Sequence, residues 1–398
     1  MSDDHRDSVL ILNGSHAEIP LINAAHELGF RVITSGADPT GLGHPYADAY
    51  VPADFSDADS ILAIARDQGV VGVISACNDF AAITAARVTW ELGLPGHDTP
   101  DTCITLHHKD KFRSLMEALD LAPIRSVLLR STDETDEQVA NLRWPLIVKP
   151  VDLTGGKGMT VCHTPDDLAP AVERALEQTR ADYVVIEEYL AGTHHGFTSF
   201  IEAGKVTWWF ADDEQYFLNP LLVAGTSTPS SLPSSAINDL VNSVEVIATE
   251  CSLTDGLVHI QCIITEDGPH IIELCRRCPG DLYPDFVNIS TGHDYASVVV
   301  RSELGLSLDI PDAPPEPAPT VRYCAMAAAD GYFQELSISS RIAGNVVSTW
   351  SLMGPEAPIK DHLTEKQAII FLRFPTMSEV QQHLNVRDAD VLVAVRGW

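Results

Sequence analysis

Residues 144–161 read Trp144-Pro-Leu-Ile-Val-Lys149-Pro-Val-Asp-Leu-Thr154-Gly-Gly-Lys157-Gly-Met-Thr-Val161, and they carry the most informative pattern of the chain. A lysine ends a short apolar strand, and a turn of Thr, three Gly and a second Lys follows. Glycines let backbone N–H groups approach phosphate oxygens, because no Cβ stands in the way and positive φ is accessible. The two lysines supply compensating charge. The pattern predicts a hairpin that binds a polyphosphate nucleotide.

The length and composition limit the class of protein. With 398 residues the chain is too long for one ordinary core, so we expect two or three domains. It has no long apolar run, no signal-peptide pattern at the first residues and no disulfide-framework spacing of cysteines, which predicts a cytoplasmic protein. The formal charge of −31, from 56 acidic and 25 basic residues, argues against nucleic acid or an anionic membrane as a partner.

The first hundred residues alternate between buried strands and amphipathic helices. We expect strands at 8–13, 30–34 and 70–75 and helices at 18–28, 56–68 and 79–92. This order predicts a small doubly wound parallel sheet. Gly14-Ser-His lacks the further glycines of a dinucleotide fingerprint, so a cofactor is not expected there.

The rest of the chain predicts a longer antiparallel region and a separate tail. One helix is expected from Thr99 to Leu119, with His107 and His108 as a pair on its surface, and the polar residues 226–235 are expected to form a loop. Further strands are expected at 182–190, 197–202, 205–210, 256–265 and 269–275. Residues 310–319 are rich in proline and predict a stiff linker, and residues 320–398 predict an α+β unit with no obvious chemistry.

Oxygen ligands and arginines gather on the predicted hairpin of strands 256–265 and 269–275. Gln261 and Glu273 are twelve residues apart across its turn, a spacing that can place both side chains on one face, where they could bind Mg²⁺. Arg276 and Arg277 follow directly, and an arginine beside a metal-bound triphosphate can neutralise charge on a transferred phosphoryl group. Pairing of Arg276 with an acid such as Asp281, in place of contact with substrate, is the alternative.

Taken in order, the glycine hairpin, Glu187-Glu188-Tyr-Leu190, the Gln261 and Glu273 pair and Arg277 resemble the ATP-grasp superfamily of carboxylate–amine ligases. The resemblance covers roughly residues 1–310. It implies a protein of α/β and α+β class: an N-terminal doubly wound parallel sheet (1–108), a central two-lobed ATP-grasp domain (109–310, with its nucleotide-binding lobe at about 109–190) and a small C-terminal α+β domain (311–398).

The resemblance also implies roles for particular residues. Gln261 and Glu273 would bind Mg²⁺ or Mn²⁺, and Arg277, Lys157 and Arg276 would act on the reacting groups. ATP would be bound by Lys111, Lys149, Thr154, Gly155, Gly156, Lys157, Gly158, Glu187, Glu188, Leu190 and His195, with His194 as an alternative to His195.

The function implied is ATP-dependent activation of a carboxylate as an acyl phosphate, followed by ligation to an amine. Small-molecule substrates, most simply amino acids, and a homodimer are expected. Cys275 stands where the family usually has an asparagine ligand, and a thiol is a poor ligand for a hard cation. Two alternatives remain open at this point: an enzyme that activates bicarbonate, and a nucleotide-binding module without catalysis.

Overall fold

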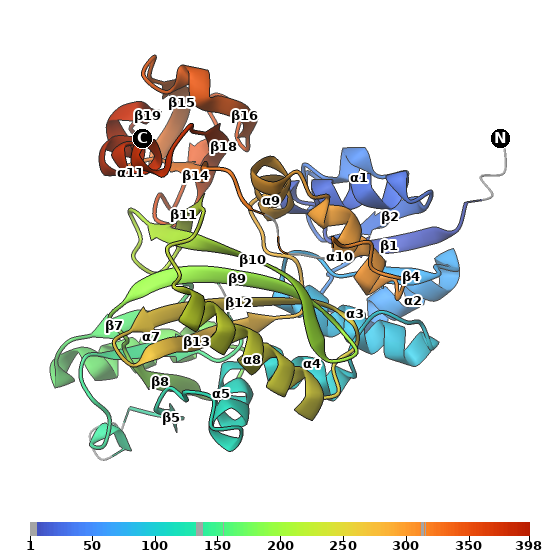
Figure 1. Ribbon diagram of the computed structural model, residues 1–398, viewed down its shortest axis with the longest axis horizontal. Helices are drawn as coiled ribbons and strands as arrows, with labels where there is room; N and C mark the ends of the chain where they lie inside the picture. Colours follow the sequence, from blue (N-terminus) through green and yellow to red (C-terminus); the bar gives the residue numbers. More distant parts are fainter. Residues whose placement is uncertain (1–5, 133–137, 154, 312–313, 315) are drawn as a thin grey trace.

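The computed structural model describes residues 6–132, 138–153, 155–311, 314 and 316–398. The described residues form four sheets (Figure 1), and several of the predicted motif residues lie on strands of two of them. In the described part of the chain, no helix has both the length and the apolar content needed to span a bilayer.

The N-terminal unit is a four-stranded parallel sheet in the order β3-β2-β1-β4. Its strands and helices are β1 (Ser8–Leu12), α1 (Ile19–Glu27), β2 (Arg31–Ser35), β3 (Ala49–Tyr50), α2 (Ala58–Gln68), β4 (Gly72–Ile74) and α3 (Asp79–Leu92). Gly69 and Gly93 end α2 and α3 in the left-handed conformation, which is why these helices stop where the sequence predicts. The predicted doubly wound unit is confirmed.

Two short helices follow where the sequence predicts one. They are α4 (Pro100–His107) and α5 (Lys109–Ala118), and the chain is extended between them, at His108, with φ −93° and ψ 122°. The single predicted helix is therefore wrong in one respect. After the break, Phe112 and Met116 of α5 pack into the core of the largest sheet, while α4 packs on α3.

A small antiparallel sheet comes next, in the order β5-β8-β6-β7. Its elements are β5 (Ser126–Leu129), β6 (Leu146–Pro150), β7 (Thr160–Cys162), α7 (Leu168–Gln178) and β8 (Val184–Glu188). Strands β6 and β7 pair antiparallel and are joined by the glycine segment, so the predicted hairpin is present. Helix α7 packs on this sheet through Leu168, Ala171 and Val172.

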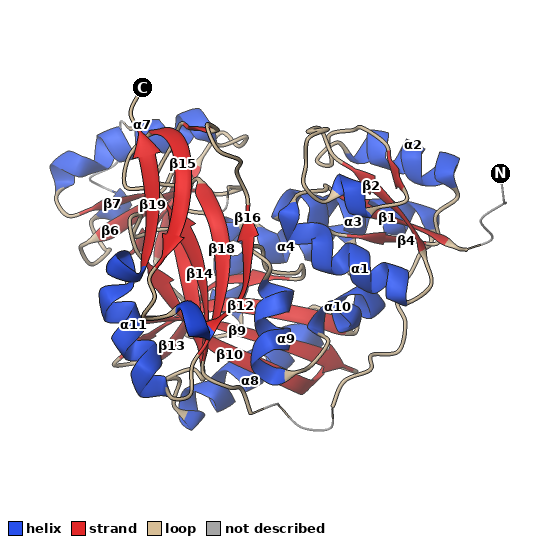
Figure 2. Cartoon of the chain, turned by 90° about the horizontal axis from the view of Figure 1, so that it is seen from above, coloured by secondary structure: helices blue, strands red, loops and turns tan. Residues whose placement is uncertain are grey.

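The largest sheet has eight antiparallel strands in the order β13-β12-β9-β10-β11-β14-β18-β16 (Figure 2). The strands are β9 (Thr193–Glu202), β10 (Lys205–Tyr216), β11 (Val223–Thr228), β12 (Gly256–Thr265), β13 (Gly268–Cys275), β14 (Thr320–Met326), β16 (Val346–Ser351) and β18 (Lys366–Arg373). Helix α8 (Ser234–Glu250) covers one face. The loop predicted at 226–235 begins as strand β11, because its Thr and Ser residues pair with β10 and β14.

Residues after the proline-rich segment extend this large sheet. Strands β14, β18 and β16 continue it, and a three-stranded sheet, β17-β15-β19, packs beside them. The remaining elements are α9 (Tyr283–Thr291), α10 (Tyr295–Glu303), β15 (Gly331–Ile338), β17 (Pro358–Ile359), α11 (Met377–Asp390) and β19 (Val391–Arg396). Helix α10 lies between α1 and strand β12, and one apolar core joins the N-terminal unit to the large sheet (Figure 1).

Candidate functional site

A cavity of about 310 Å³ lies between the small antiparallel sheet and the large sheet. Residues from both sheets line it, and so do the segment after β13 and two side chains from β14 and β18. Nine of the predicted site residues line this cavity: Lys149, Gly155, Gly156, Glu187, Glu188, Leu190, Gln261, Glu273 and Arg277. Motifs separated by more than a hundred residues therefore meet at one place.

Lys149 and Glu187 form a buried ion pair on neighbouring strands β6 and β8. Lys149 Nζ lies 2.6 Å from Glu187 Oε2, and Arg113 Nε lies 2.7 Å from Glu187 Oε1. Burial by itself raises the pKa of Glu187, but Arg113 and Lys149 outweigh it and lower the pKa to about 2. Both carboxylate oxygens are thus engaged by cations. Glu187 therefore holds Lys149 and Arg113 in place.

The first predicted basic residue, Lys111, does not face the cavity, whereas Lys109, two positions earlier, does. Lys111 is exposed, and Lys109 Nζ donates to the carbonyl of Leu153 at 2.5 Å. Residues 109 and 113 are four apart, so they share one face of α5, whereas residue 111 points away from that face. Spacing along α5 was the signal that could have identified Lys109 and Arg113.

The glycine hairpin has the conformation that its sequence requires. Gly155, Gly156 and Gly158 have φ of 66°, 73° and 69°. A Cβ on Gly156 would lie 2.5 Å from the carbonyl oxygen of Leu221, so this close approach also needs glycine. Lys157 is exposed and Gly158 is half-buried, and neither lines the cavity; Thr154 lies outside the described residues.

Gln261 and Glu273 face each other directly across β12 and β13, as their spacing predicts. The Gln261 amide donates from Nε2 to Glu214 Oε1 at 2.7 Å, which leaves its Oε1 for another partner. Glu273 has no hydrogen bond within the described residues. Two free oxygen ligands on one cavity wall fit a magnesium ion, which prefers oxygen ligands. Cys275 lies on the same strand, two residues beyond Glu273, beside Asp79 and His107.

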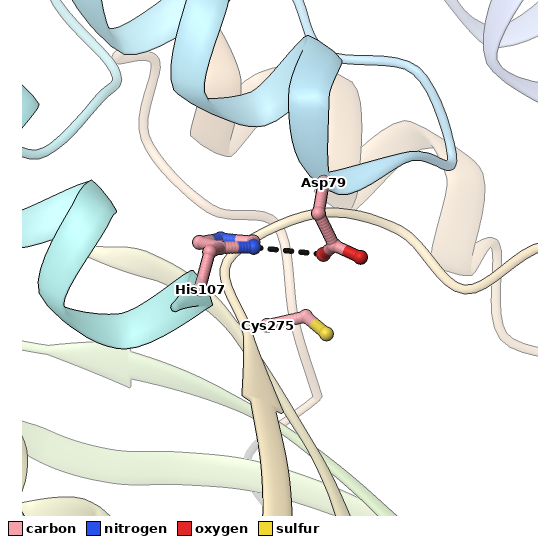
Figure 3. A group of neighbouring side chains, drawn as sticks. All are labelled: Asp79, His107 and Cys275. Carbon is pink, nitrogen blue, oxygen red and sulfur yellow. Dashed lines mark hydrogen bonds and ion pairs between the residues drawn. The ribbon is translucent and has the colours of Figure 1, made fainter. Parts of the chain in front are cut away.

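Arg277 is held at the other end of the cavity by Asp79, the first residue of α3. Arg277 Nε and Nη2 donate to the two Asp79 oxygens at 3.0 and 3.2 Å. His107 is not the surface residue that the sequence suggests: it is buried, and its Nδ1 lies 2.7 Å from Asp79 Oδ1 (Figure 3). Burial opposes the charge of Asp79, but Arg277 and His107 lower its pKa well below the usual value.

Asp79, His107 and Cys275 are close enough together to hold a metal ion, since their ligand atoms lie within 4.8 Å of one another (Figure 3). The hydrogen bonds argue against that role. The Arg277 guanidinium already neutralises Asp79, and His107 Nε2 accepts the backbone N–H of Arg276 at 3.2 Å. The group is best described as the anchor of Arg277.

Two predicted residues point away from the cavity. Arg276 pairs with Asp98 at 2.7 Å and donates to the carbonyls of Leu257 and Thr254. These partners lie outside the cavity, so the Arg276 side chain is held away from it. His195 is buried between Asp213 and Thr193, at 2.8 and 2.7 Å. Its neighbour His194 lines the cavity instead. Successive residues of an extended chain point to opposite sides, so an error of one position moves a side chain out of the site.

Besides Lys109, two basic residues on strands of the large sheet line the cavity and were not predicted from the sequence. Arg322 on β14 is 4% exposed, and its Nη1 donates to the carbonyls of Gly280 and Asp281 at 2.9 and 3.1 Å. Its Nε has no partner within the described residues. Lys366 on β18 pairs with Asp281. Each is a single cation in an alternating strand, with no motif around it, so no sequence signal marks either one.

The family described as the carbamoyl-phosphate synthase L chain, ATP binding domain, matches residues 108–201. The L-amino acid ligase from Bacillus licheniformis superposes with a TM-score of 0.84 at 18% identity and covers 98% of this chain and 99% of its own. The phosphoribosylglycinamide synthetase from Anaerococcus prevotii superposes with a TM-score of 0.76 at 19% identity, covering 98% and 100%. The chain has the ATP-grasp fold.

Sequence relatives agree with the ATP-grasp fold. The carbamoyl phosphate synthase large chain of Ralstonia nicotianae is 22% identical over 382 residues, which is 92% of this chain and 34% of that protein. A formate-dependent phosphoribosylglycinamide formyltransferase of a Synechococcus species is 28% identical over 186 residues, 46% of this chain and 47% of that protein. The chain thus spans about a third to a half of these relatives. The predicted ATP-grasp resemblance and fold class are confirmed.

Proposed function

We propose that this protein is an ATP-dependent ligase that activates a carboxylate as an acyl phosphate and joins it to an amine. The observation that carries the proposal is the cavity itself. Lys149 and the glycine hairpin lie in the same space as Gln261, Glu273 and the two arginines Arg277 and Arg322. Groups suited to bind a triphosphate, a divalent cation and a carboxylate thus line one cavity, where ATP and the carboxylate substrate would be bound together.

The nucleotide would lie between the two sheets. Lys109 and Lys149 would bind phosphate oxygens, Glu188 and Leu190 would border the adenine, and the hairpin with Gly155 and Gly156 would cover the phosphates and exclude water. Lys157, at the exposed tip, would reach the terminal phosphate only after the hairpin closes. Gln261 and Glu273 would hold Mg²⁺ or Mn²⁺, which when bound neutralises charge on the phosphate oxygens.

The arginines would serve the reacting carboxylate. Arg277, fixed by Asp79, and Arg322, fixed by the carbonyls of Gly280 and Asp281, would bind the carboxylate and stabilise the negative charge that develops on the acyl phosphate. The terminal phosphoryl group of ATP would pass to the carboxylate as ADP leaves. The amine would then attack the carbonyl carbon, the C–N bond would form as the nitrogen loses a proton to solvent, and the C–O bond would break to release phosphate. Arg276 has no part in this scheme, because its contacts lie outside the cavity.

We further propose amino acids as substrates and a homodimer. The likeness to the L-amino acid ligase structure supports the choice of substrate. A bicarbonate-activating reaction is the second candidate, since a biotin carboxylase domain of Hydrogenobacter thermophilus, solved with MgADP and bicarbonate, superposes with a TM-score of 0.78 at 16% identity.

Phosphate release from ATP tests these proposals. We expect release only when a carboxylate and an amine are both present, with pairs of amino acids as the first screen. Release that depends on bicarbonate alone would favour the second candidate, and ATP binding without turnover under any condition would contradict both. Glu273→Ala should abolish release while the unfolding temperature stays near that of the wild type, which separates a lost ligand from a lost fold.

A further inference from the structure

The candidate metal site has too little negative charge if it consists only of the residues that the sequence identifies. Gln261 is a neutral ligand, and Cys275 offers sulfur rather than oxygen. Glu273 is then the single carboxylate for a divalent cation. Magnesium in protein sites is usually held by one or two carboxylates together with phosphate oxygens, so a second acid in the same place would strengthen the site.

Glu214 is such an acid, and it lies on a strand that carries none of the site residues predicted from the sequence. It lies on β10, lines the cavity, and accepts the Gln261 amide at 2.7 Å and the Tyr216 hydroxyl at 2.8 Å. Because an ionised carboxylate only accepts hydrogen bonds, Gln261 must turn its nitrogen to Glu214 and its oxygen away from it. Each Glu214 oxygen keeps a lone pair for a further partner.

A glycine makes this approach possible. Strand β9 runs between β12 and β10, and Gly196 is its residue opposite both Gln261 and Asp212. A Cβ on Gly196 would lie 2.7 Å from Asp212 Oδ2, so any larger residue would fill the space over the strand. Without a side chain there, the Gln261 amide reaches across β9 to the carboxylate of Glu214.

An independent observation also indicates a ligand beside Glu214. Thr226 on β11 is the residue directly opposite Glu214, and it lines the same cavity. It is 2% exposed, yet its hydroxyl has no hydrogen-bond partner within the described residues. A buried hydroxyl without a partner is unfavourable, so a hydrogen-bonding group or a water molecule held by one is expected next to it.

We propose that Glu214 is a third oxygen ligand of the metal ion, together with Gln261 and Glu273. The inference rests on the proposed function, since it takes the cation to be the one that accompanies ATP. Glu214 replaces the charge that an acid at position 261 would supply, and its hydrogen bond fixes the orientation of the Gln261 amide. The Thr226 hydroxyl would then form a hydrogen bond with a water molecule bound to the ion or with an atom of the nucleotide.

The test is the binding of Mn²⁺ to the full chain in the presence of ADP, followed by electron paramagnetic resonance of the free ion. Glu214→Gln keeps the size and the hydrogen-bonding capacity of the side chain but removes its charge. We expect Mn²⁺ to bind at least tenfold more weakly. The double variant Glu214→Gln/Gln261→Glu returns one carboxylate to the same pair, and we expect its affinity to lie within threefold of the wild type.

The control is Glu250→Gln, an exposed acid at the end of α8, which should leave the affinity unchanged. Unchanged binding in Glu214→Gln, or a double variant as weak as the single one, overturns the role of Glu214 while the proposed function stands. If the wild type binds no Mn²⁺ with ADP, both proposals fail. Thermal unfolding of each variant, followed by circular dichroism, shows whether weaker binding comes from a damaged fold.

Discussion

At the scale of the residue, Arg277 depends on its anchor. Its side chain is 12% exposed, its guanidinium is bonded to both oxygens of Asp79, and it also donates to the carbonyl of Cys278 at 3.3 Å. Removing one partner of a buried ion pair leaves the other charge without compensation, which typically costs about 3–5 kcal/mol. The pair therefore joins helix α3 of the N-terminal unit to the end of β13.

We expect Asp79→Asn to lower the free energy of unfolding by about 3 kcal/mol or more. Urea denaturation followed by circular dichroism measures it. Asp59→Asn is the matched control, because Asp59 pairs with Arg87 at the surface, where such pairs contribute less than about 1 kcal/mol. Equal stabilities of the two variants would contradict the importance of the buried pair.

His259 allows a prediction about pH at the same scale. Burial lowers the pKa of His259 to about 3, and Arg277 and Arg322 add to the effect. The unfolded chain binds a proton on this residue near pH 6.5, so between pH 6.5 and pH 3 the unfolded state holds more protons than the folded state. Its contribution to stability is therefore complete above pH 6.5 and is lost as the pH falls.

In His259→Asn, the fall in stability between pH 6.5 and pH 4 should be shallower than in the wild type, by at most about 1.4 kcal/mol per pH unit. Urea denaturation at a series of pH values gives the two slopes. His163→Asn removes an exposed histidine and should leave the slope unchanged. Identical slopes for His259→Asn and the wild type would show that His259 is not kept neutral by the fold.

At the scale of the element, the glycine hairpin between β6 and β7 offers a comparison of neighbouring positions. Gly155 and Gly156 both have positive φ, so alanine is strained at each. They differ in their surroundings. Among the described residues, a Cβ at Gly155 meets no atom within 4 Å, whereas one at Gly156 collides with the backbone of Leu221.

Gly156→Ala should therefore displace the hairpin and raise the KM for MgATP at least fivefold above that of Gly155→Ala. Initial rates of phosphate release at varied ATP give both constants, and the unfolding temperatures show whether either variant is damaged elsewhere. If the two variants have the same KM, the contact of Gly156 with Leu221 does not position the hairpin, and only the backbone conformation matters.

At the scale of the whole molecule, the cavity is assembled from parts that are far apart in the chain. Strands β14 and β18 complete the eight-stranded sheet, and they also contribute Arg322 and Lys366 to the cavity. Strand β14 pairs with β11, and Cys324, Ile369 and Phe371 belong to the core that the N-terminal unit shares. The predicted boundary near residue 310 therefore crosses a continuous sheet and a continuous core.

A chain that ends at residue 319 should for this reason fail to fold. Without β14 and β18, the truncated chain would expose the edge of β11 and the apolar residues that β18 covers in the full chain. Both favour aggregation. Size-exclusion chromatography and thermal unfolding test this against the full chain. A monomeric fragment with the cooperative transition of the full chain would contradict it, and would mean that the C-terminal residues only add to a complete sheet.

The sequence alone determined the local features of this protein. Glycines and apolar periodicity determined the hairpin at 155–158, the parallel N-terminal unit and the paired strands that bring Gln261 opposite Glu273. Each of these features depends on neighbours along the chain or across one turn. The tertiary structure decided which way each side chain faces and what it meets. The structure places Lys109 and His194 at the cavity, where the sequence had predicted Lys111 and His195. Arg276 lies outside the cavity, and three residues that were not predicted line it: Glu214, Arg322 and Lys366. These positions depend on strands and helices that only packing brings together.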